Sequence, residues 1–339
     1  MKNKEIISVG VIGAGGFIGQ DHLKRLSTVI EGVNIEMLYD LNTEKCTELA
    51  NKYHARVASS AEALIADPQV DAVLITAWDG VHADLTLKCI AARKPVFCEK
   101  PLATTIEDCK KIVEAEKEAG ETLVQVGFMR RYDRGYMAMK HAISSNEIGA
   151  PLMIHAAHRN MSQAPGFETD YAVTRVAIHE IDICRWLLDD EYATAQVLGV
   201  RQSSRTSGEW LNPQIMMLTT RSGQRIDVEV QTDGAYAYDI QCHVVGEDGI
   251  VSLPDPTSVT KRAAAAIHTP LMTDWKDRFI EAYDIEFQEW AKSLLNGAPT
   301  GPSAWDGYVA CVTGDALIRS RQTGKPEDIV LPEKPEMYQ

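Results

Sequence analysis

The sequence lacks any run of about 20 apolar residues, the length that a helix needs to cross a bilayer. It also lacks an apolar signal segment with a small-residue cleavage site near its first residues, so we do not expect a secretory protein. Its seven cysteines are scattered over 339 residues and form no Cys-x-x-Cys pair. An odd number of cysteines in a long chain favours free thiols in a reducing compartment, and we expect a cytoplasmic protein.

Positive charge is scarce as well. Lysine and arginine number 34 against 48 aspartates and glutamates, which leaves a formal net charge of −14. This balance argues against a surface for nucleic acid or for anionic lipid, so we expect no nucleic-acid partner and no membrane. A hydrophobic content of 45% is ordinary for a globular protein, and the length suits two domains.

The sequence pattern changes near Val126 and divides the chain into two parts. Up to Val126, short apolar runs alternate with helical patterns, beginning with VGVIG, GQDHLKRLSTVI and VNIEMLYD. This alternation predicts βαβ units around a buried parallel sheet. From Gly127 onward the strand patterns lengthen and alternate, turn sequences stand at 221–224 and 246–249, and a helix is expected near Trp275–Leu295. We therefore predict an α/β protein with domains at 1–126 and 127–339.

A glycine-rich turn follows the first predicted strand, at 8–12. Glycines in such a turn let the chain reverse sharply and bring backbone N–H groups close to a pyrophosphate at a helix N-terminus. The spacing reads GxGxxxG or GxxGxxG, which is weak evidence alone. The second strand, however, ends in Asp40, whose carboxylate can accept hydrogen bonds from both ribose hydroxyls of NAD and would repel the extra phosphate of NADP. These residues predict an NAD site made of Gly13, Gly15, Gly16, Phe17, Ile18 and Asp40.

The GxxGxxG spacing also fits extended short-chain dehydrogenases, which use a Tyr-x-x-x-Lys pair. Tyr136 and Lys140 match that pair. A serine partner about a dozen residues upstream is missing, and the long antiparallel second half has no place in that fold. We do not favour this alternative.

Four further motifs are spread over the chain. They are Glu99-Lys100-Pro101 after the strand PVFCEK, TAWDGVH at 76–82, GFMRRY at 127–132 and HEID at 179–182. Together they resemble the Gfo/Idh/MocA oxidoreductase family, and HAAHRN, YDIQC, VGEDG and GPSAWDGYVA bring the chain closest to its inositol 2-dehydrogenases. The resemblance covers nearly the whole chain. It implies an N-terminal Rossmann dinucleotide-binding domain, a C-terminal α/β domain with a large, mostly antiparallel open sheet, hydride transfer to NAD, and a homotetramer.

The resemblance assigns the chemistry to Lys100 and His179. Lys100 stands at the carboxyl end of a parallel strand, where open α/β sheets place their ligands. In the family this lysine contacts cofactor and substrate hydroxyl and assists electrostatically, and the peptide bond before the following proline is cis. A neutral imidazole, with an ordinary pKa near ~6.5, can accept the hydroxyl proton, so His179 is the expected general base. HEID lacks a second histidine one turn on, so we expect no metal.

Other residues are assigned by the same resemblance. The cofactor would be bound by Trp78, His82, Glu99 and Lys100 in addition to the glycine turn and Asp40. The small-molecule polyol substrate would be bound by Met129, Arg130, His158, Asn160, Arg175, His179, Tyr238 and Tyr283.

One position departs from the family. Four residues before the base, inositol dehydrogenases carry an aspartate, and here that position is Arg175. On an α-helix Arg175 and His179 would share a face, and a fixed cation would lower the pKa of the histidine where an aspartate would stabilise the imidazolium. The alternative is that Arg175 turns towards solvent or a neighbouring acid.

Three functions remain open. The first is NAD-dependent oxidation of a secondary hydroxyl of an inositol, myo-inositol or another isomer, to the inosose. In the second, Arg175 binds the carboxylate of a sugar acid. In the third, the chain is an NAD-binding sensor without turnover. Retention of Lys100 and His179 disfavours the sensor, and the mostly uncharged polar candidates favour a polyol. We predict an inositol dehydrogenase.

Overall fold

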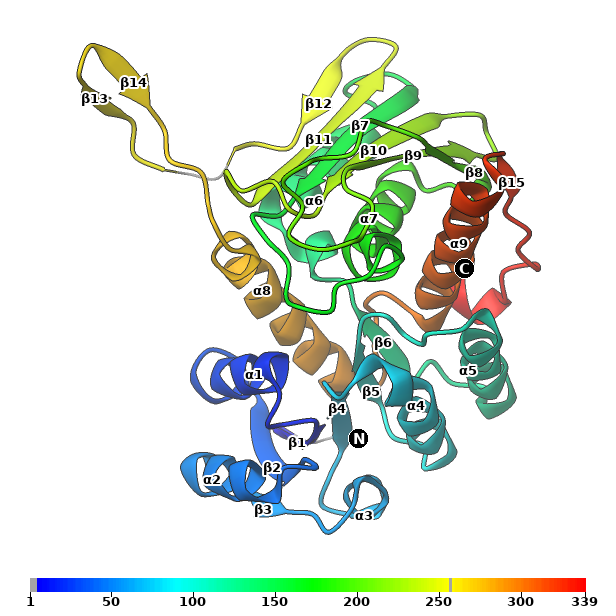
Figure 1. Cartoon of the computed structure of the whole chain (residues 1–339). Helices are drawn as coiled ribbons and strands as arrows, with labels where there is room; N and C mark the ends of the chain where they lie inside the picture. Colours follow the sequence, from blue (N-terminus) through cyan, green and yellow to red (C-terminus); the bar gives the residue numbers. More distant parts are fainter. Residues whose placement is uncertain (1–4, 256–257) are drawn as a thin grey trace. The chain divides into compact units, whose positions relative to one another are not determined.

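The computed structural model describes residues 5–255 and 258–339 (Figure 1). The chain forms two compact units. Unit 1 contains Met1–Phe128, Tyr283–Cys311 and Leu331–Gln339, and unit 2 contains Met129–Ala282 and Val312–Val330. Two of the boundaries between them fall within helices, one in α8 (Trp275–Leu295), which is non-helical at Phe279, and one in α9 (Ala304–Thr323).

Unit 1 is built on a parallel six-stranded sheet in the order β3-β2-β1-β4-β5-β6. The strands are β1 (Ile7–Ile12), β2 (Val33–Tyr39), β3 (Arg56–Val57), β4 (Ala72–Ile75), β5 (Val96–Glu99) and β6 (Val124–Gly127). The helices between them are α1 (Phe17–Thr28), α2 (Thr43–Tyr53), α3 (Ala61–Ala66), α4 (His82–Ala91) and α5 (Ile106–Ala119), with a 3-10 turn at Asp79–Val81. The predicted Rossmann architecture is confirmed.

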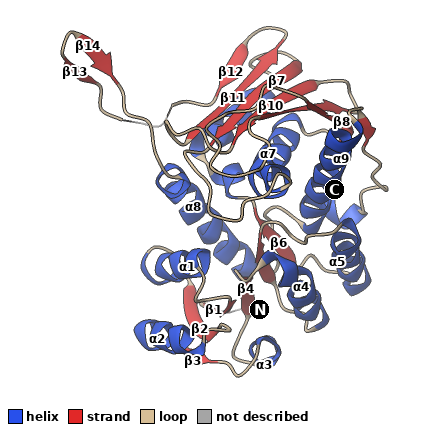
Figure 2. Ribbon diagram, viewed as in Figure 1, coloured by secondary structure: helices blue, strands red, loops and turns tan. Residues whose placement is uncertain are grey.

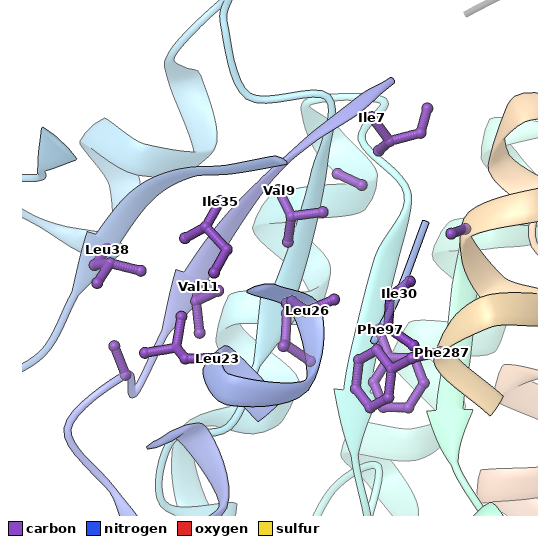
Figure 3. Packing of buried hydrophobic residues seen from close by; sticks show 14 of the residues in the cluster. Ile7, Val9, Val11, Leu23, Leu26, Ile30, Ile35, Leu38, Phe97 and Phe287 are labelled. Atoms are coloured by element: carbon purple, nitrogen blue, oxygen red, sulfur yellow. The ribbon is translucent and has the colours of Figure 1, made fainter. Parts of the chain in front are cut away.

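The core of unit 1 explains why the short apolar runs become central strands. Val9 and Val11 of β1 pack with Leu23 and Leu26 of α1, so the strand and its helix share one cluster (Figure 3). Phe97 of β5 lies in the same cluster. Strands covered on both faces read as continuous apolar sequences, which is the pattern of VGVIG.

Unit 2 is built on a seven-stranded sheet in the order β12-β11-β7-β10-β9-β8-β15. Its strands are β7 (Pro151–Arg159), β8 (Tyr192–Leu198), β9 (Gln214–Thr220), β10 (Arg225–Gln231), β11 (Asp239–Gly246), β12 (Ile250–Ser252) and β15 (Glu327–Asp328). Among the paired strands, β7 and β10 run parallel and the others antiparallel, so the predicted mostly antiparallel open sheet is confirmed. The hairpin turns expected at 221–224 and 246–249 join β9 to β10 and β11 to β12.

The remaining elements of unit 2 are a 3-10 turn at Met129–Tyr132, α6 (Arg134–Ser144), a π-helix at Ala172–Ala177, α7 (Ile178–Leu188) and the two-stranded ribbon of β13 (Lys261–Ala263) and β14 (Ala266–His268). Figure 2 shows α6 and α7 on one side of the seven-stranded sheet. Residues of β9 alternate between buried and half-buried, as expected for a sheet covered on one face. No helix among the described residues is long and apolar enough to cross a membrane.

Candidate active site

The glycine turn joins β1 to α1 and depends on glycine at two positions. Gly13 has φ +87°, a left-handed conformation, and a Cβ there would lie 2.5 Å from the backbone nitrogen of Ala77. A Cβ on Gly19 would lie 2.3 Å from the carbonyl oxygen of Gly13. Gly16 precedes the first turn of α1 and no side chain caps it. The turn therefore leaves backbone N–H groups at a helix N-terminus, the arrangement that suits a pyrophosphate.

Asp40 directly follows β2 and is held in one orientation. Its Oδ2 accepts a hydrogen bond from the N–H of Gly15 at 2.7 Å, and its Oδ1 accepts one from the N–H of Asn42 at 2.8 Å. An ionised carboxylate has about four lone-pair sites, so these two bonds orient Asp40 and leave acceptor capacity for two ribose hydroxyls. The residues of this edge fit NAD.

Two predicted cofactor residues expose aromatic rings close to the carboxyl ends of neighbouring strands. Phe17 begins α1 and is 57% exposed, while Trp78 follows β4 and is 70% exposed. The Trp78 ring lies against Gly80, where a Cβ would come within 2.3 Å of it. Ile18 is half-buried in the first turn of α1. Open α/β sheets bind their ligands outside the carboxyl ends of the strands. The exposed rings of Phe17 and Trp78 lie at that edge of the sheet.

Lys100 follows β5, is half-buried, and precedes a cis bond to Pro101, as the family resemblance implies. The neighbouring Glu99 is buried: its Oε1 lies 2.7 Å from Nε2 of His22, and its Oε2 accepts the N–H of Lys100 at 3.2 Å. Burial alone would raise the pKa of Glu99, but His22 and Lys100 outweigh it and lower that pKa. Glu99 contacts groups of its own unit on both oxygens, and one of these contacts is the backbone of Lys100.

His82 was also predicted to bind cofactor. Its buried ring contacts the backbone of Pro101, the residue that follows Lys100. Nδ1 lies 2.7 Å from the carbonyl oxygen of Pro101, and Nε2 lies 2.9 Å from that of Ala77. Carbonyl oxygens only accept, so both ring nitrogens donate and the ring is an imidazolium. Burial lowers the pKa of His82, but Cys98 and the two carbonyls raise it, to about 9.

Unit 2 buries three of the polar residues around α7 in one cluster. Arg130 and Glu180 form an ion pair, and Nδ1 of His158 lies 2.9 Å from Glu180 Oε2 and 3.1 Å from an Arg130 nitrogen. Burial alone would raise the pKa of Glu180, yet Arg130 and His158 lower it to about 2. The glutamate is therefore ionised and neutralises the arginine inside the unit. Met129 is buried at the start of the neighbouring 3-10 turn.

His179 lies in the first turn of α7, close to this cluster. Its ring centroid is 6.4 Å from that of His158, which in turn lies 5.7 Å from the ring of Tyr238. Burial raises the pKa of Tyr238 to about 12, so the phenol remains a neutral donor. Asn160 follows β7, and its buried Oδ1 accepts no hydrogen bond from the described residues. A buried acceptor of this kind suits a ligand hydroxyl.

The expectation for Arg175 needs a correction. The sequence predicted one α-helix through Arg175 and His179, but Arg175 lies in the π-helix at Ala172–Ala177 and α7 begins after it. The wider π winding means that the four-residue spacing no longer places the two side chains directly above one another. The guanidinium of Arg175 lies over the ring of Tyr171, 3.8 Å from its centroid, as in a cation–π contact.

Tyr283 belongs to unit 1, whereas the other predicted substrate residues belong to unit 2. Its buried ring lies 5.5 Å from that of His22 and 5.0 Å from the guanidinium carbon of Arg25. Neither His22 nor Arg25 was predicted from the sequence. Both lie on the buried side of α1, and no motif marks them.

The structure shows where the two residues of the Tyr-x-x-x-Lys pattern lie. Tyr136 is buried in α6, and the ammonium of Lys140 donates to the carbonyl oxygen of Trp186 at 2.7 Å. This pair holds α6 against α7 and does not form a dehydrogenase site.

Within the described residues no group of three or more histidine, cysteine, aspartate or glutamate side chains could hold a metal ion.

Both parts of the chain match domains of one known protein family. Residues 7–128 match the oxidoreductase family (Gfo/Idh/MocA) with an NAD-binding Rossmann fold, and residues 140–329 match the C-terminal alpha/beta domain of that family. Inositol 2-dehydrogenases of Serratia proteamaculans and Azotobacter vinelandii are 48% and 49% identical over 334 residues, which is 98% of this chain and 99% and 98% of theirs. The crystal structure of myo-inositol dehydrogenase from Lactobacillus casei in complex with NAD(H) and myo-inositol has a TM-score of 0.95 and 38% identity, covering 98% of this chain and all of that one.

Proposed function

The chain belongs to the Gfo/Idh/MocA oxidoreductase family and binds NAD, and from this premise we propose that it oxidises a secondary hydroxyl of an inositol to the inosose. The observation that carries the proposal is the match, over 98% of the chain, to relatives named inositol 2-dehydrogenase. The polar cluster beside His179 supports it, since the charges of Arg130 and Glu180 neutralise each other there. A neutral set of donors and acceptors suits a ring of hydroxyls.

We assign the chemistry to two side chains. When bound, NAD supplies the hydride acceptor, held by the glycine turn and Asp40. His179 takes the hydroxyl proton, and the ammonium of Lys100 stabilises the negative charge that develops on the hydroxyl oxygen as its proton leaves. The oxidised carbon loses a hydride and the oxygen loses a proton, so a carbonyl results. His158, Asn160, Arg130 and Tyr238 are proposed to bind the other hydroxyls.

We propose that residues 1–126 bind NAD and that residues 127–339 bind substrate and form a homotetramer through the sheet face opposite α6 and α7. That face carries half-buried side chains such as Met217 and Gln241, which a second copy of the chain would cover in the tetramer. A cytoplasmic location is supported by the seven cysteines, none of which is bridged.

The test is a panel of inositols, hexoses and sugar acids, assayed for NAD reduction with purified protein. At least one inositol should be oxidised, and Lys100→Ala or His179→Ala should lower kcat by about 10²- to 10⁴-fold. Exposed residues of the same types provide matched controls, and Lys110→Ala and His141→Ala should leave kcat unchanged. The same panel run with NADP tests the contribution of Asp40.

Two outcomes would redirect the assignment. Turnover of a sugar acid without turnover of any inositol would overturn the inositol proposal and favour carboxylate binding by Arg175. NAD binding without turnover of any member would favour the sensor.

A further inference from the structure

A series of buried and partly buried hydrogen bonds within unit 1 ends at the backbone of Lys100. Arg25 Nε donates to Asp284 Oδ1 at 2.7 Å, and a terminal nitrogen of Arg25 lies 2.8 Å from Nδ1 of His22. Nε2 of His22 lies 2.7 Å from Glu99 Oε1, and Glu99 Oε2 accepts the Lys100 N–H at 3.2 Å. The series joins α8, α1 and the end of β5.

The chemistry of the series determines the direction of each bond. A guanidinium nitrogen can only donate, so Nδ1 of His22 must accept from Arg25. The ring proton is therefore on Nε2 and is donated to Glu99. Because Nδ1 accepts from Arg25, the ring donates through Nε2 alone. His22 thus presents one donor to the glutamate.

Packing keeps this ring in place. His22 is 0% exposed, and its ring centroid lies 4.5 Å from that of Phe287 and 5.5 Å from that of Tyr283, both on α8. The guanidinium of Arg25 lies over the same tyrosine. A side chain enclosed in this way cannot rotate without disturbing the core, so the direction in which Glu99 points is determined by α1 and α8.

We propose that His22 is a positioning residue for Lys100: through Glu99 it fixes the backbone of the lysine, and so the direction in which its side chain leaves β5. This inference rests on the proposed function for the role of Lys100 in the reaction. A purely structural pair between His22 and Glu99 would stabilise the fold without altering the action of Lys100, and the two roles differ in what a substitution at His22 changes.

The kinetic test compares two substitutions at His22. His22→Phe keeps a ring but removes both nitrogens, and kcat should fall about tenfold to a hundredfold because Lys100 is misplaced. His22→Gln restores an amide donor near the Nε2 position and an acceptor for Arg25, and should recover most of kcat. The double variant His22→Phe/Lys100→Ala should be no slower than Lys100→Ala alone, since His22 acts only through Lys100.

Leu294→Ala is the matched control for lost stability. Leu294 is buried in the core of unit 1 and makes no hydrogen bond in the series, so this variant should lower Tm with kcat unchanged well below Tm. If His22→Phe does not fold, His22→Asn replaces it, because its shorter amide can meet Arg25 but cannot reach Glu99.

A second measurement needs no substrate. The Lys100 amide donates to Glu99, so its hydrogen exchange should accelerate by about tenfold or more in His22→Phe and stay unchanged in His22→Gln and Leu294→Ala. The inference is overturned if His22→Phe leaves both kcat and the exchange of this amide unchanged, or if the double variant is slower than Lys100→Ala. If the unaltered protein oxidises no inositol, the proposed function fails, while amide exchange still decides whether His22 orders Lys100.

Discussion

Each unit contains a buried arginine, histidine and glutamate that are linked by contacts, but the order of contact differs. In unit 2, Arg130 pairs directly with Glu180, and His158 touches both. All three are almost completely buried, so the arginine and the glutamate depend on each other for charge compensation.

In unit 1 the histidine stands between the two charged groups. Arg25 contacts His22, and His22 contacts Glu99, while the charge of Arg25 is balanced by Asp21 and Asp284. The side chains of those aspartates are 31% and 27% exposed. Since water can reach them, the arginine of unit 1 can be lost with less uncompensated buried charge than the arginine of unit 2.

The largest predicted effect follows from this difference. Arg130→Met leaves Glu180 ionised and buried without its ion-pair partner, and should lower the free energy of unfolding by about 3–5 kcal/mol. Arg25→Met removes a charged hydrogen bond to Asp284, which remains partly solvated, and one to the buried Nδ1 of His22, and should cost about 1–3 kcal/mol. Urea unfolding at neutral pH measures both changes.

Arg134→Met is the surface control for these two substitutions. Arg134 pairs with Glu281 through side chains that are 73% and 61% exposed, and its loss should cost less than about 1 kcal/mol. Equal costs for Arg130→Met and Arg25→Met would contradict the proposed difference between the units.

The second prediction concerns pH. The pKa of His82 is raised from its ordinary value to about 9, so its contribution to stability is complete below about pH 6.5 and is lost as the pH rises through 9. This contribution amounts to about 3 kcal/mol at most. The pKa of Glu180 in unit 2 is about 2, so that group stays ionised over the same range. Alkaline loss of stability should therefore originate in unit 1.

Unfolding of the unaltered protein and of His82→Gln at about pH 6 and about pH 9.5 measures this term. The unaltered protein should lose more stability between the two pH values than the variant does. Identical losses would show that His82 is not charged in the folded protein.

The smallest predicted effect concerns specificity in unit 2. If Arg175 acts on the base, Arg175→Asp should raise kcat/KM with myo-inositol by about tenfold, or about 1.4 kcal/mol, because a carboxylate stabilises the imidazolium that forms at His179. Arg201→Asp makes the same change in charge at an exposed position and should have no effect. An unchanged kcat/KM in Arg175→Asp would place Arg175 outside the site and leave its contact with Tyr171 as its role.

Local patterns predicted the elements of the fold well. The turns at 221–224 and 246–249 and the helix at Trp275–Leu295 are found where their sequences indicated. The glycine turn and Asp40 also lie together as expected, because they occupy the ends of adjacent parallel strands. In each case the pattern lies within a few residues or follows from the alternation of strand and helix.

The candidate site was less predictable where it depends on contacts between distant residues. His22 and Glu99 are 77 positions apart, and only the packing of α1 against the sheet brings them together. Glu99 and His82 belong to family motifs, but only the structure shows that they contact the backbone of Lys100 and Pro101. The π-helix around Arg175 is also a tertiary outcome, since AVTRVA has no feature that distinguishes it from an α-helix.

The sequence by itself determined the two-part α/β architecture, the NAD site and the residues expected to perform the chemistry. The architecture and the glycine turn depend on hydrophobic periodicity and glycine conformation, which are local, whereas Lys100 and His179 were assigned through the resemblance to the family. Only the tertiary structure decided which buried charges compensate one another and which side chains orient Lys100 and surround His179. Those contacts depend on how a helix face meets a strand end many residues away, where a hydrogen bond forms only if both groups arrive within about 3 Å.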